Sequence, residues 1–391
     1  MNTIRQYVVF SFITSLAISA IVVEYVPFLR ETGFSLSEIA LLSLGYNVLI
    51  AMIEVPTGIY ADRRGCKSAV QWSQVIYVGG ITLYGLTASK SFVIMAVVLT
   101  AISFAMQSGA RQSWLMSQMT TATTPKQRRR AFADSTLAAQ CGAILAPMLS
   151  AALKAQWQVN VFFLSAILSL IALAVTFFWS PDQPTARPHQ GWAELFHQGR
   201  LAALEYPLLR WLGWMSFVFA LISVVTNQWS LALRESHWPM DGYWVWFAMQ
   251  AGLMLGSVAY RQLPGHHAPF AMVVSLTIAG GCLVFAVRSP DYGWMALLAL
   301  LQASRAFFQV ARDHAVQSSV PMEVRATAAS WISLASQIGM MAVLGFTSLA
   351  TIGRHTALEA MQVTWMPAGL ALITCSVFFY LRYRVKRYVW S

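Results

Sequence analysis

Residues 54–67 read Glu54-Val-Pro-Thr-Gly58-Ile-Tyr-Ala-Asp62-Arg63-Arg64-Gly65-Cys66-Lys67; they close one apolar run, Leu36 to Tyr60, and precede the next, Ala69 to Thr87. A helix of about 20 residues crosses the hydrocarbon core of a bilayer, and each run is long enough. Backbone groups in lipid must bond within their own segment, which favours helices. The stretch therefore predicts the turn of a helical membrane hairpin, and its basic residues indicate the cytoplasmic side.

Composition extends this interpretation to the whole chain. Of the 391 residues, 57% are apolar and 10% are charged, and the mean hydropathy is +0.57. Soluble domains carry about 25% charged residues. We predict an all-α membrane protein with twelve transmembrane helices in two pseudo-symmetric six-helix bundles. The remaining spans are roughly Tyr7 to Phe28, Phe92 to Trp114, Ala131 to Leu153, Val159 to Trp179, Leu209 to Leu233, Tyr243 to Tyr260, Pro269 to Val287, Trp294 to Arg312, Ala326 to Ile352 and Pro367 to Tyr383.

The basic residues set the orientation. Most Lys and Arg fall in loops that share one side of the membrane, and this positive-inside bias places both termini in the cytoplasm of a bacterial-type inner membrane. The formal net charge of +11 therefore reflects topology, and we expect the bilayer and a small-molecule substrate as partners, with no nucleic acid. Because the spans use nearly the whole length, no room is left for a soluble catalytic domain, and we expect no enzyme activity.

The chain divides near its middle. We expect an N-terminal bundle at 1–180, a cytoplasmic linker at 181–207 and a C-terminal bundle at 208–391. Within the linker, an apolar pattern favours a short surface helix as much as a flexible segment; its residues are Trp192, Leu195, Phe196, Leu201 and Leu204.

The two halves contain related sequences. Arg130-Ala-Phe-Ala-Asp-Ser135 recurs as Arg325-Ala-Thr-Ala-Ala-Ser330, and Gly58-Ile-Tyr-Ala-Asp62-Arg63 as Gly256-Ser-Val-Ala-Tyr260-Arg261. In the fourth and tenth spans Gln107 precedes Arg111 and Gln302 precedes Arg305. Repeated six-helix halves around a site near the midplane are a transporter architecture.

Residues 58–67 resemble the loop signature of the major facilitator superfamily, Gly-x-x-x-Asp-Arg-x-Gly-Arg-Lys, except that Cys66 stands where Arg is usual. This resemblance implies a loop that gates the inward-open transition. Asp62 with Arg325 at the start of the eleventh span is our candidate latch between the halves, and Arg261 with Asp134 is a possible mirror. A solvated charge run that only fixes topology is the alternative. The gating set is Gly58, Asp62, Arg63, Gly65, Lys67, Arg261, Arg325 and Asp134.

The fifth span contains Gly142-Ala-Ile-Leu-Ala146-Pro147-Met-Leu-Ser150-Ala151. It resembles the antiporter motif of the same family, Gly-x-x-x-Gly-Pro-x-x-Gly-Gly, with Ala146 and Ser150 as small replacements. Such residues let helices pack closely, and Pro147 bends the helix. The resemblance favours efflux by antiport, although the same residues occur in helices that only pack.

Four ionisable residues fall inside spans, where each costs about 2.5 to 3.5 kcal/mol and usually serves function. They are Glu24, Glu54, Arg111 and Arg305. We place Glu24 at the outer end of the first span, Arg111 toward the outer part of the fourth and Arg305 near the middle of the tenth. Two arginines facing one cavity would clamp a carboxylate or phosphate; alternatively each is neutralised inside the protein, for example Arg111 by Glu24. Further substrate contacts are expected from Gln107, Trp114, Asn227, Gln228, Gln302 and Gln309.

A carboxylate in a cavity can exchange protons as the cavity opens to each side in turn. Glu24 is the first candidate for this role and Glu54 the second. The stretch around Gly65 lacks the glycine and strand of a nucleotide-binding loop, and His266-His267 lacks a third metal ligand. We therefore expect no nucleotide, no metal and no cofactor, with a proton gradient as the energy source.

Together these features predict a monomeric secondary transporter that exports a small amphiphilic or anionic molecule by proton-coupled alternating access. The Glu-Val-Pro-Thr-Gly form of the loop resembles exporters of drugs and of secreted metabolites such as siderophores. Proton-coupled uptake of a nutrient anion or sugar is the alternative within transport. A transporter-like sensor or scaffold is the alternative outside it.

Overall fold

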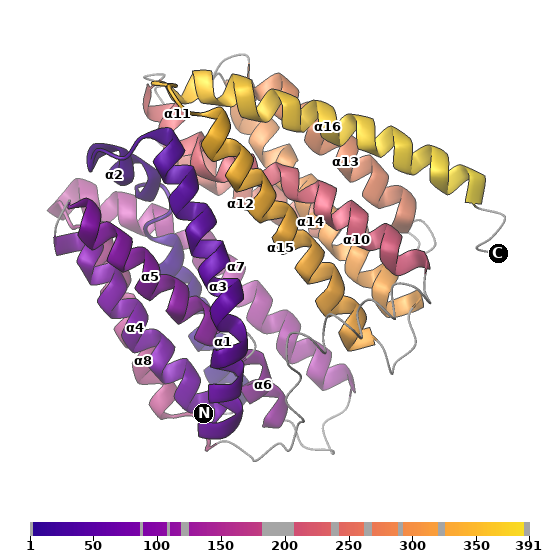
Figure 1. The fold of residues 1–391 in the computed structure, drawn as a ribbon. Coiled ribbons are helices and arrows are strands. Elements are labelled where there is room, and N and C mark those ends of the chain that lie inside the picture. The colour runs from indigo at the N-terminus through magenta and orange to yellow at the C-terminus, as the bar shows by residue number, and fades with distance from the viewer. Residues whose placement is uncertain are drawn as a thin grey trace. The chain divides into compact units, whose positions relative to one another are not determined.

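A computed structural model describes residues 3–86, 89–107, 110–118, 125–181, 207–235, 242–261, 268–287, 292–319 and 325–386. Some side chains inside helices also lie outside this description, among them those of Gly58, Asp62, Arg63, Asn227, Arg261 and Arg325. Within the described ranges all regular secondary structure is helical (Figure 1). The predicted surface helix of the linker lies outside these residues.

The helices follow the predicted spans closely. The first half contains α1 (Thr3–Ser19), α2 (Tyr25–Glu31), α3 (Leu36–Arg64), α4 (Cys66–Leu86), α5 (Lys90–Gln107), α6 (Ala110–Ser117), α7 (Pro125–Trp157) and α8 (Val161–Phe177). The second half contains α10 (Pro207–Phe219), the 3₁₀ helix η1 (Ala220–Asn227), α11 (Trp229–Glu235), α12 (Gly242–Arg261), α13 (Ala268–Ala286), α14 (Tyr292–Ser319), α15 (Arg325–Ala350) and α16 (Ala357–Lys386). Among the described residues these helices make up twelve spans, because three spans consist of more than one helix. These are α1 with α2, α5 with α6, and α10 with η1 and α11.

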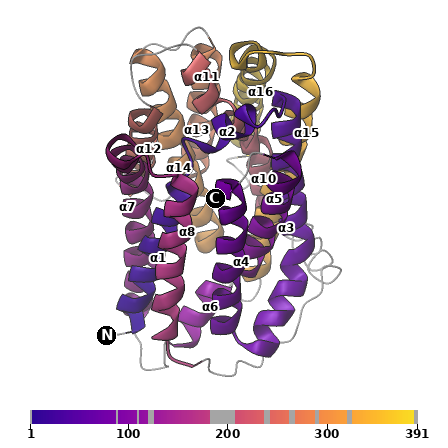
Figure 2. The same ribbon diagram turned by 90° about the vertical axis from the view of Figure 1, so that its left-hand side faces the viewer.

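Contacts group the chain into two compact units. The first contains Met1–Phe34 and Leu42–His189, and the second contains Ser35–Leu41 and Gln190–Ser391. In the first unit α1 packs along α7 and α8 (Figure 2), and α4 packs between α5 and α8. In the second unit α14 packs against α12 and α13, and α10 packs against α15.

The helices carry the apolar surface that lipid requires. Seven helical segments of the described chain are long and apolar enough to cross a membrane, and α8 and parts of α1 and α13 are shorter apolar helices. Large apolar side chains such as Met52, Leu145 and Leu349 are exposed on them. In water such a surface would drive aggregation, whereas in a bilayer it contacts acyl chains at no cost.

Local sequence signals set several helix ends. Ser35 and Glu38 form a capping box at the start of α3, in which the Ser35 N–H donates to Glu38 Oε2 at 2.7 Å and the Glu38 N–H to Ser35 Oγ at 3.2 Å. Gly65, with a φ of 97°, separates α3 from α4 and adopts a conformation that favours glycine. The last span begins at Ala357 rather than at Pro367, because Thr356 and Glu359 form a second capping box there.

Candidate functional site

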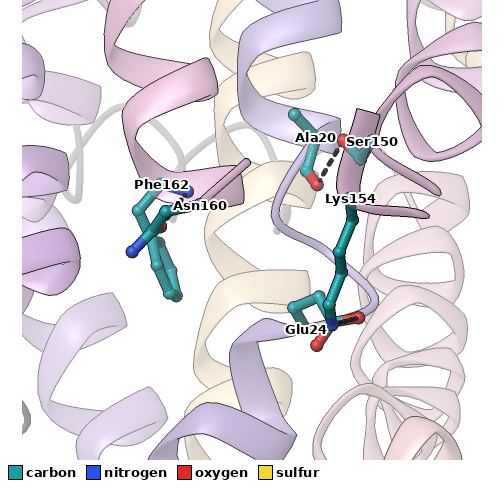
Figure 3. A network of polar contacts seen from close by, with 6 residues as sticks. All are labelled: Ala20, Glu24, Ser150, Lys154, Asn160 and Phe162. Atoms are coloured by element: carbon teal, nitrogen blue, oxygen red, sulfur yellow. Dashed lines mark hydrogen bonds and ion pairs between the residues drawn. The ribbon is translucent and has the colours of Figure 1, made fainter. Parts of the chain in front are cut away.

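The first span is broken between α1 and α2, at residues 20–24 (Figure 3). Two buried hydroxyl groups from neighbouring helices satisfy carbonyl groups at the end of α1. Ser150 Oγ on α7 donates to the Ala20 carbonyl at 2.9 Å, and Ser165 Oγ on α8 donates to the Ala17 carbonyl at 2.7 Å. Irregular backbone is tolerated at membrane depth where protein supplies such partners, so the break is closed internally.

Glu24 lies at this break and forms an ion pair across it. Its Oε1 is 2.9 Å from Lys154 Nζ on α7, one turn beyond Ser150 (Figure 3), and the side chains of Glu24 and Lys154 are 14% and 48% exposed. The suggested neutralisation of Arg111 by Glu24 is therefore not what the structure shows. Glu24 lies immediately before α2, toward the end of the first span that is opposite the amino terminus.

The antiporter-like motif packs α7 against α1. A Cβ atom on Gly142 would lie 2.5 Å from the Phe12 carbonyl oxygen, closer than atoms can approach, so only glycine fits. Ala146 is fully buried against Leu16 and Ala20, and Pro147 lies inside α7. Each of the motif residues Gly142, Ala146 and Ser150 thus has a structural role in this helix pair.

The second half repeats this glycine contact. A Cβ atom on Gly339 of α15 would lie 2.6 Å from the Phe217 carbonyl oxygen of α10. Gly142 and Gly339 therefore occupy corresponding places, on the fifth spans of the two halves, against their first spans. Since the second copy lies outside any antiporter-like sequence, close packing accounts for the glycine in both.

Arg111 lies at the same end of the first unit as the start of α1. The predicted cytoplasmic amino terminus would make this the inner end, so the two sequence predictions, a cytoplasmic amino terminus and an outer Arg111, do not hold together. Arg111 lies close to the hydroxyl of Tyr7, in the first turns of α1. The last residues of the fourth span lie beside the start of α1, where the rings of Trp114 and Tyr7 stack with 6.4 Å between centroids. Trp114 is fully buried there and stacks on Trp179 with 3.8 Å between ring centroids. Arg111 and Trp114 thus hold helices together.

Side chains from three helices hold the end of α8, where the central linker begins. Lys67 Nζ donates to the Trp179 carbonyl at 2.6 Å, and Gln6 Nε2 donates to the Phe178 carbonyl at 3.0 Å. A cation near the carboxyl end of a helix is also favoured by the helix dipole. The basic residue that ends the cytoplasmic loop signature therefore caps a helix of its own half.

Two further donors continue this arrangement along the chain. Trp114 Nε1 donates to the Ser180 carbonyl at 3.2 Å and Gln118 Nε2 to the Pro181 carbonyl at 3.0 Å. We call the four donors Gln6, Lys67, Trp114 and Gln118 the α8 anchor. It holds successive carbonyl groups up to Pro181.

The rest of the predicted gating set is only partly described. The side chains of Gly58, Asp62, Arg63, Arg261 and Arg325 lie outside the described part of the structure. Asp134 is exposed on α7, and Glu54 is half-buried in α3. The predicted latches, and the proton-coupling role of Glu54, therefore stay predictions.

The seventh span is broken like the first, but with different surroundings. Its middle third is the 3₁₀ helix η1, between α10 and α11. Ser216, Ser223 and Ser230 follow one another at intervals of seven residues through this break, and each has a buried hydroxyl oxygen that lacks a hydrogen-bond partner among the described residues. Gln228 Oε1 accepts a hydrogen bond from Thr364 Oγ1 at 3.0 Å. The second break thus contains polar groups that the chain itself leaves unsatisfied.

Arg305 differs from Arg111 in its surroundings. It lies in the middle of α14, its side chain is exposed, and no acidic side chain forms an ion pair with it in the described part of the chain. Gln302, one turn away, has a buried Oε1 without a partner among the described residues, and Gln309 is half-buried on the same helix. Of the two predicted arginines, Arg305 is the one for which the described residues provide neither an acidic partner nor another polar contact.

Helix contacts correct the predicted correspondence between the two arginines. In the first half Thr57 Oγ1 donates to the Ala105 carbonyl at 3.1 Å. In the second half the Cβ position of Gly256 lies 2.0 Å from the Ala303 carbonyl oxygen. Thr57, the neighbour of Gly58 in the sequence, thus meets Ala105 as Gly256 meets Ala303. Matching Gly58 with Gly256, as the sequence repeat suggests, then matches Ala105 with Ala303.

The same offset pairs Gln107 with Arg305 and Arg111 with Gln309. The two arginines therefore stand one helical turn apart, about 6 Å at 1.5 Å per residue, in their respective halves. The similar sequences Gln107 to Arg111 and Gln302 to Arg305 had suggested that the two arginines occupy equivalent positions. The helix contacts place them one turn apart instead.

Some polar partners could not be found from the sequence. Lys154 stands in a predicted outer loop, and Ser165 and Ser223 are single hydroxyl residues within apolar runs. A weak signal exists for Ser216, Ser223 and Ser230, whose spacing places them along one side of a helix.

The comparisons with known proteins agree with this architecture. The family model described as Major Facilitator Superfamily matches residues 7–344. A search of curated proteins gave no match. Among solved structures, the nucleoside transporter NupG is similar with a TM-score of 0.77 at 14% identity, over 97% of this chain and 99% of that one.

Two other solved structures show the same fold. The peptide-type transporter described as the POT family transporter PepTSo has a TM-score of 0.77 at 11% identity, over 98% of each chain. A bacterial homolog of the human lysosomal transporter Spinster, inward-facing and occupied, has a TM-score of 0.74 at 15% identity, over 97% of this chain and 96% of that one. At such identities the likeness is one of fold.

Proposed function

Because the chain belongs to the Major Facilitator Superfamily, we propose that this integral membrane protein is a secondary transporter that exports a small amphiphilic or anionic molecule in exchange for protons. Alternating access of two six-helix halves requires no nucleotide, and the proton gradient of a bacterial inner membrane supplies the energy. Both termini lie in the cytoplasm in this proposal. The similar structures carry different kinds of substrate, so their names do not select one here.

One observation supports an anionic substrate. Arg305 is a charged side chain in the middle of a span, exposed, and without an acidic partner in the described structure. An unpaired charge inside a membrane protein is costly unless it faces water or a ligand, and the fixed fork of a guanidinium suits carboxylate and phosphate groups. An anion that binds Arg305 would neutralise this charge during transport.

The test of the proposed function compares metabolites in cells and in spent medium. Cells that lack the protein should retain an anion that cells overproducing it release into the medium, as detected by untargeted mass spectrometry. A compound that instead remains in the medium of the deficient cells would indicate uptake, which is the alternative. If no compound differs in distribution between the two kinds of cell, that result would count against transport itself.

Arg305→Gln should reduce transport of that anion roughly tenfold to a hundredfold, the effect of losing a hydrogen bond to a charged group worth about 1.5 to 3 kcal/mol. Arg305→Lys should restore part of the rate, because the charge remains. Arg312→Gln is the matched control, since Arg312 lies on the same helix and pairs with Asp313. Equal transport by the parent and Arg305→Gln would remove Arg305 from the site.

Glu24→Gln tests proton coupling. We expect the variant to exchange substrate across proteoliposome membranes at the parent rate, but to lose accumulation driven by a pH gradient, because an amide cannot carry the proton. Glu31→Gln on the neighbouring helix α2 is the control. Accumulation that still follows the pH gradient in Glu24→Gln would eliminate this assignment and leave Glu54 as the candidate.

A further inference from the structure

An outer pair of aromatic rings shows where the seventh span lies along the second unit. Trp294, near the start of α14, stacks on Trp365 of α16 with 6.1 Å between ring centroids and 5° between planes. The next residue back along α16, Thr364, donates to Gln228 at 3.0 Å. The end of η1 is therefore level with the start of α14.

An inner pair gives a second level. Phe219, the last residue of α10, stacks on Phe308 of α14 with 3.9 Å between centroids and 8° between planes. Both rings are buried. Going from the outer pair to the inner pair, residue numbers fall along the seventh span and rise along α14, so the two spans are antiparallel.

Three polar residues fall between these two levels. Ser223 is four residues beyond Phe219 in a 3₁₀ helix, about 8 Å at 2.0 Å per residue. Arg305 and Gln302 lie three and six residues before Phe308 in an α-helix, about 4.5 and 9 Å at 1.5 Å per residue. Ser223 is therefore at a height between Arg305 and Gln302. We call these three residues the polar layer.

The polar layer has unmet hydrogen-bonding capacity of a defined kind. Ser223 Oγ and Gln302 Oε1 are buried and have no partner in the described part of the chain. Each unsatisfied buried group costs about 1 to 3 kcal/mol, so a partner from outside the chain is expected. Arg305 calls for an acceptor with negative charge, whereas Gln302 Oε1 accepts and therefore calls for a donor.

We infer that the polar layer binds a carboxylate that carries a hydroxyl or amino group on the neighbouring carbon, with the carboxylate on Arg305, the donor on Gln302 Oε1 and Ser223 between them. This inference rests on the proposed function and narrows its substrate to 2-hydroxy or 2-amino acids and their derivatives.

Three matched probes test the inference on the purified full chain in detergent. Mandelate has a carboxylate, an adjacent hydroxyl group and a phenyl ring; phenylacetate lacks the hydroxyl group, and mandelamide lacks the charge. We expect mandelate to raise the thermal unfolding temperature at concentrations about tenfold lower than phenylacetate requires, the ratio for one hydrogen bond of about 1.4 kcal/mol. Mandelamide should bind more weakly still.

Variants assign the preference to residues. Gln302→Met removes the acceptor at similar volume and should abolish the tenfold preference for mandelate over phenylacetate, while weak binding of both is retained. Ser223→Ala should weaken mandelate binding. Ser304→Ala is the control on the same helix, because the Ser304 hydroxyl already donates to the Leu301 carbonyl at 2.7 Å; its probe preferences should match those of the parent.

Each other result overturns the inference. If mandelate and phenylacetate bind equally well, the site does not recognise the hydroxyl donor. If mandelamide binds as well as mandelate, the site does not recognise the negative charge. No shift with any probe means that the layer does not bind this class. If a metabolite is still exported in an Arg305-dependent way in that case, the proposed function stands and only the substrate class fails. If no metabolite depends on the protein, the proposed function itself fails.

Discussion

The first and seventh spans occupy corresponding positions in the two halves, and both are broken, but their polar groups are treated differently. At the first break, Ser150 and Ser165 satisfy free carbonyl groups, and Glu24 pairs with Lys154. At the seventh break, the hydroxyl oxygens of three serines remain without partners among the described residues. A broken helix whose groups are satisfied internally acts as structure. One whose groups are left open has capacity for a ligand, and we propose that the two halves have divided these roles. Thr14, in the middle of α1 and away from its break, is the one buried hydroxyl of the first span without a partner among the described residues.

The largest effects are expected where the halves are alike. Gly142→Ala and Gly339→Ala would each place a Cβ atom against a backbone oxygen, at 2.5 and 2.6 Å. Overpacking of this kind costs about 1 to 3 kcal/mol. We expect similar losses of unfolding free energy for the two variants in mixed-micelle denaturation.

Gly79→Ala and Gly281→Ala are the controls for this pair, because their Cβ positions have open space, and they should leave stability unchanged or slightly raised. If Gly142→Ala alone changed proton coupling at equal stability, the motif would have a role in antiport beyond packing, and the likeness between the halves would be broken.

A smaller effect should separate the two breaks. Ser150→Ala leaves the buried Ala20 carbonyl without its side-chain donor and should lower the unfolding free energy by about 1 to 2 kcal/mol. Ser223→Ala removes a buried hydroxyl group without a partner in the described chain, so stability in the absence of substrate should not fall and should rise by up to about 1 to 3 kcal/mol. Chemical denaturation of both variants measures the difference, and equal losses would contradict the contrast between the breaks.

The smallest effect is expected at the ion pair. Lys154 is 48% exposed, and exposed ion pairs contribute about 0 to 1 kcal/mol. In a double-mutant cycle with Lys154→Met and Glu24→Gln, we expect a coupling energy in that range. A coupling energy above about 2 kcal/mol would show that the ion pair contributes strongly to the stability of the first break. Proton transfer at Glu24 would then require this ion pair to break.

The sequence predicted the helices well, because long apolar runs leave few alternatives in lipid. The break at residues 20–24 was not predicted, because it contains neither Gly nor Pro and depends on hydroxyl groups from Ser150 and Ser165 far along the chain. For the same reason, the run from Leu209 to Leu233 gave no sign of η1. Tertiary partners, rather than local propensity, decide where these spans are interrupted.

The candidate site was predicted only in part. A charged residue inside an apolar span is costly and therefore indicates a functional position. Arg305 and Glu24 were selected for this reason. The predicted outer position of Arg111 does not agree with the predicted cytoplasmic amino terminus, because the end of the fourth span lies beside the start of α1. The correspondence of Arg111 with Arg305 was based on similar short sequences. The contacts of Thr57 with Ala105 and of Gly256 with Ala303 align the two halves differently.

The α8 anchor has a practical consequence for protein engineering. Because Gln6, Lys67, Trp114 and Gln118 hold the chain up to Pro181 on the first unit, a break in the polypeptide after this residue leaves the new carboxyl end fastened. The gene can therefore be divided there and its two parts produced as separate polypeptides, each ending or beginning outside its own bundle. A fluorescent reporter fused to the new carboxyl end of the first polypeptide would be tethered to the first half only.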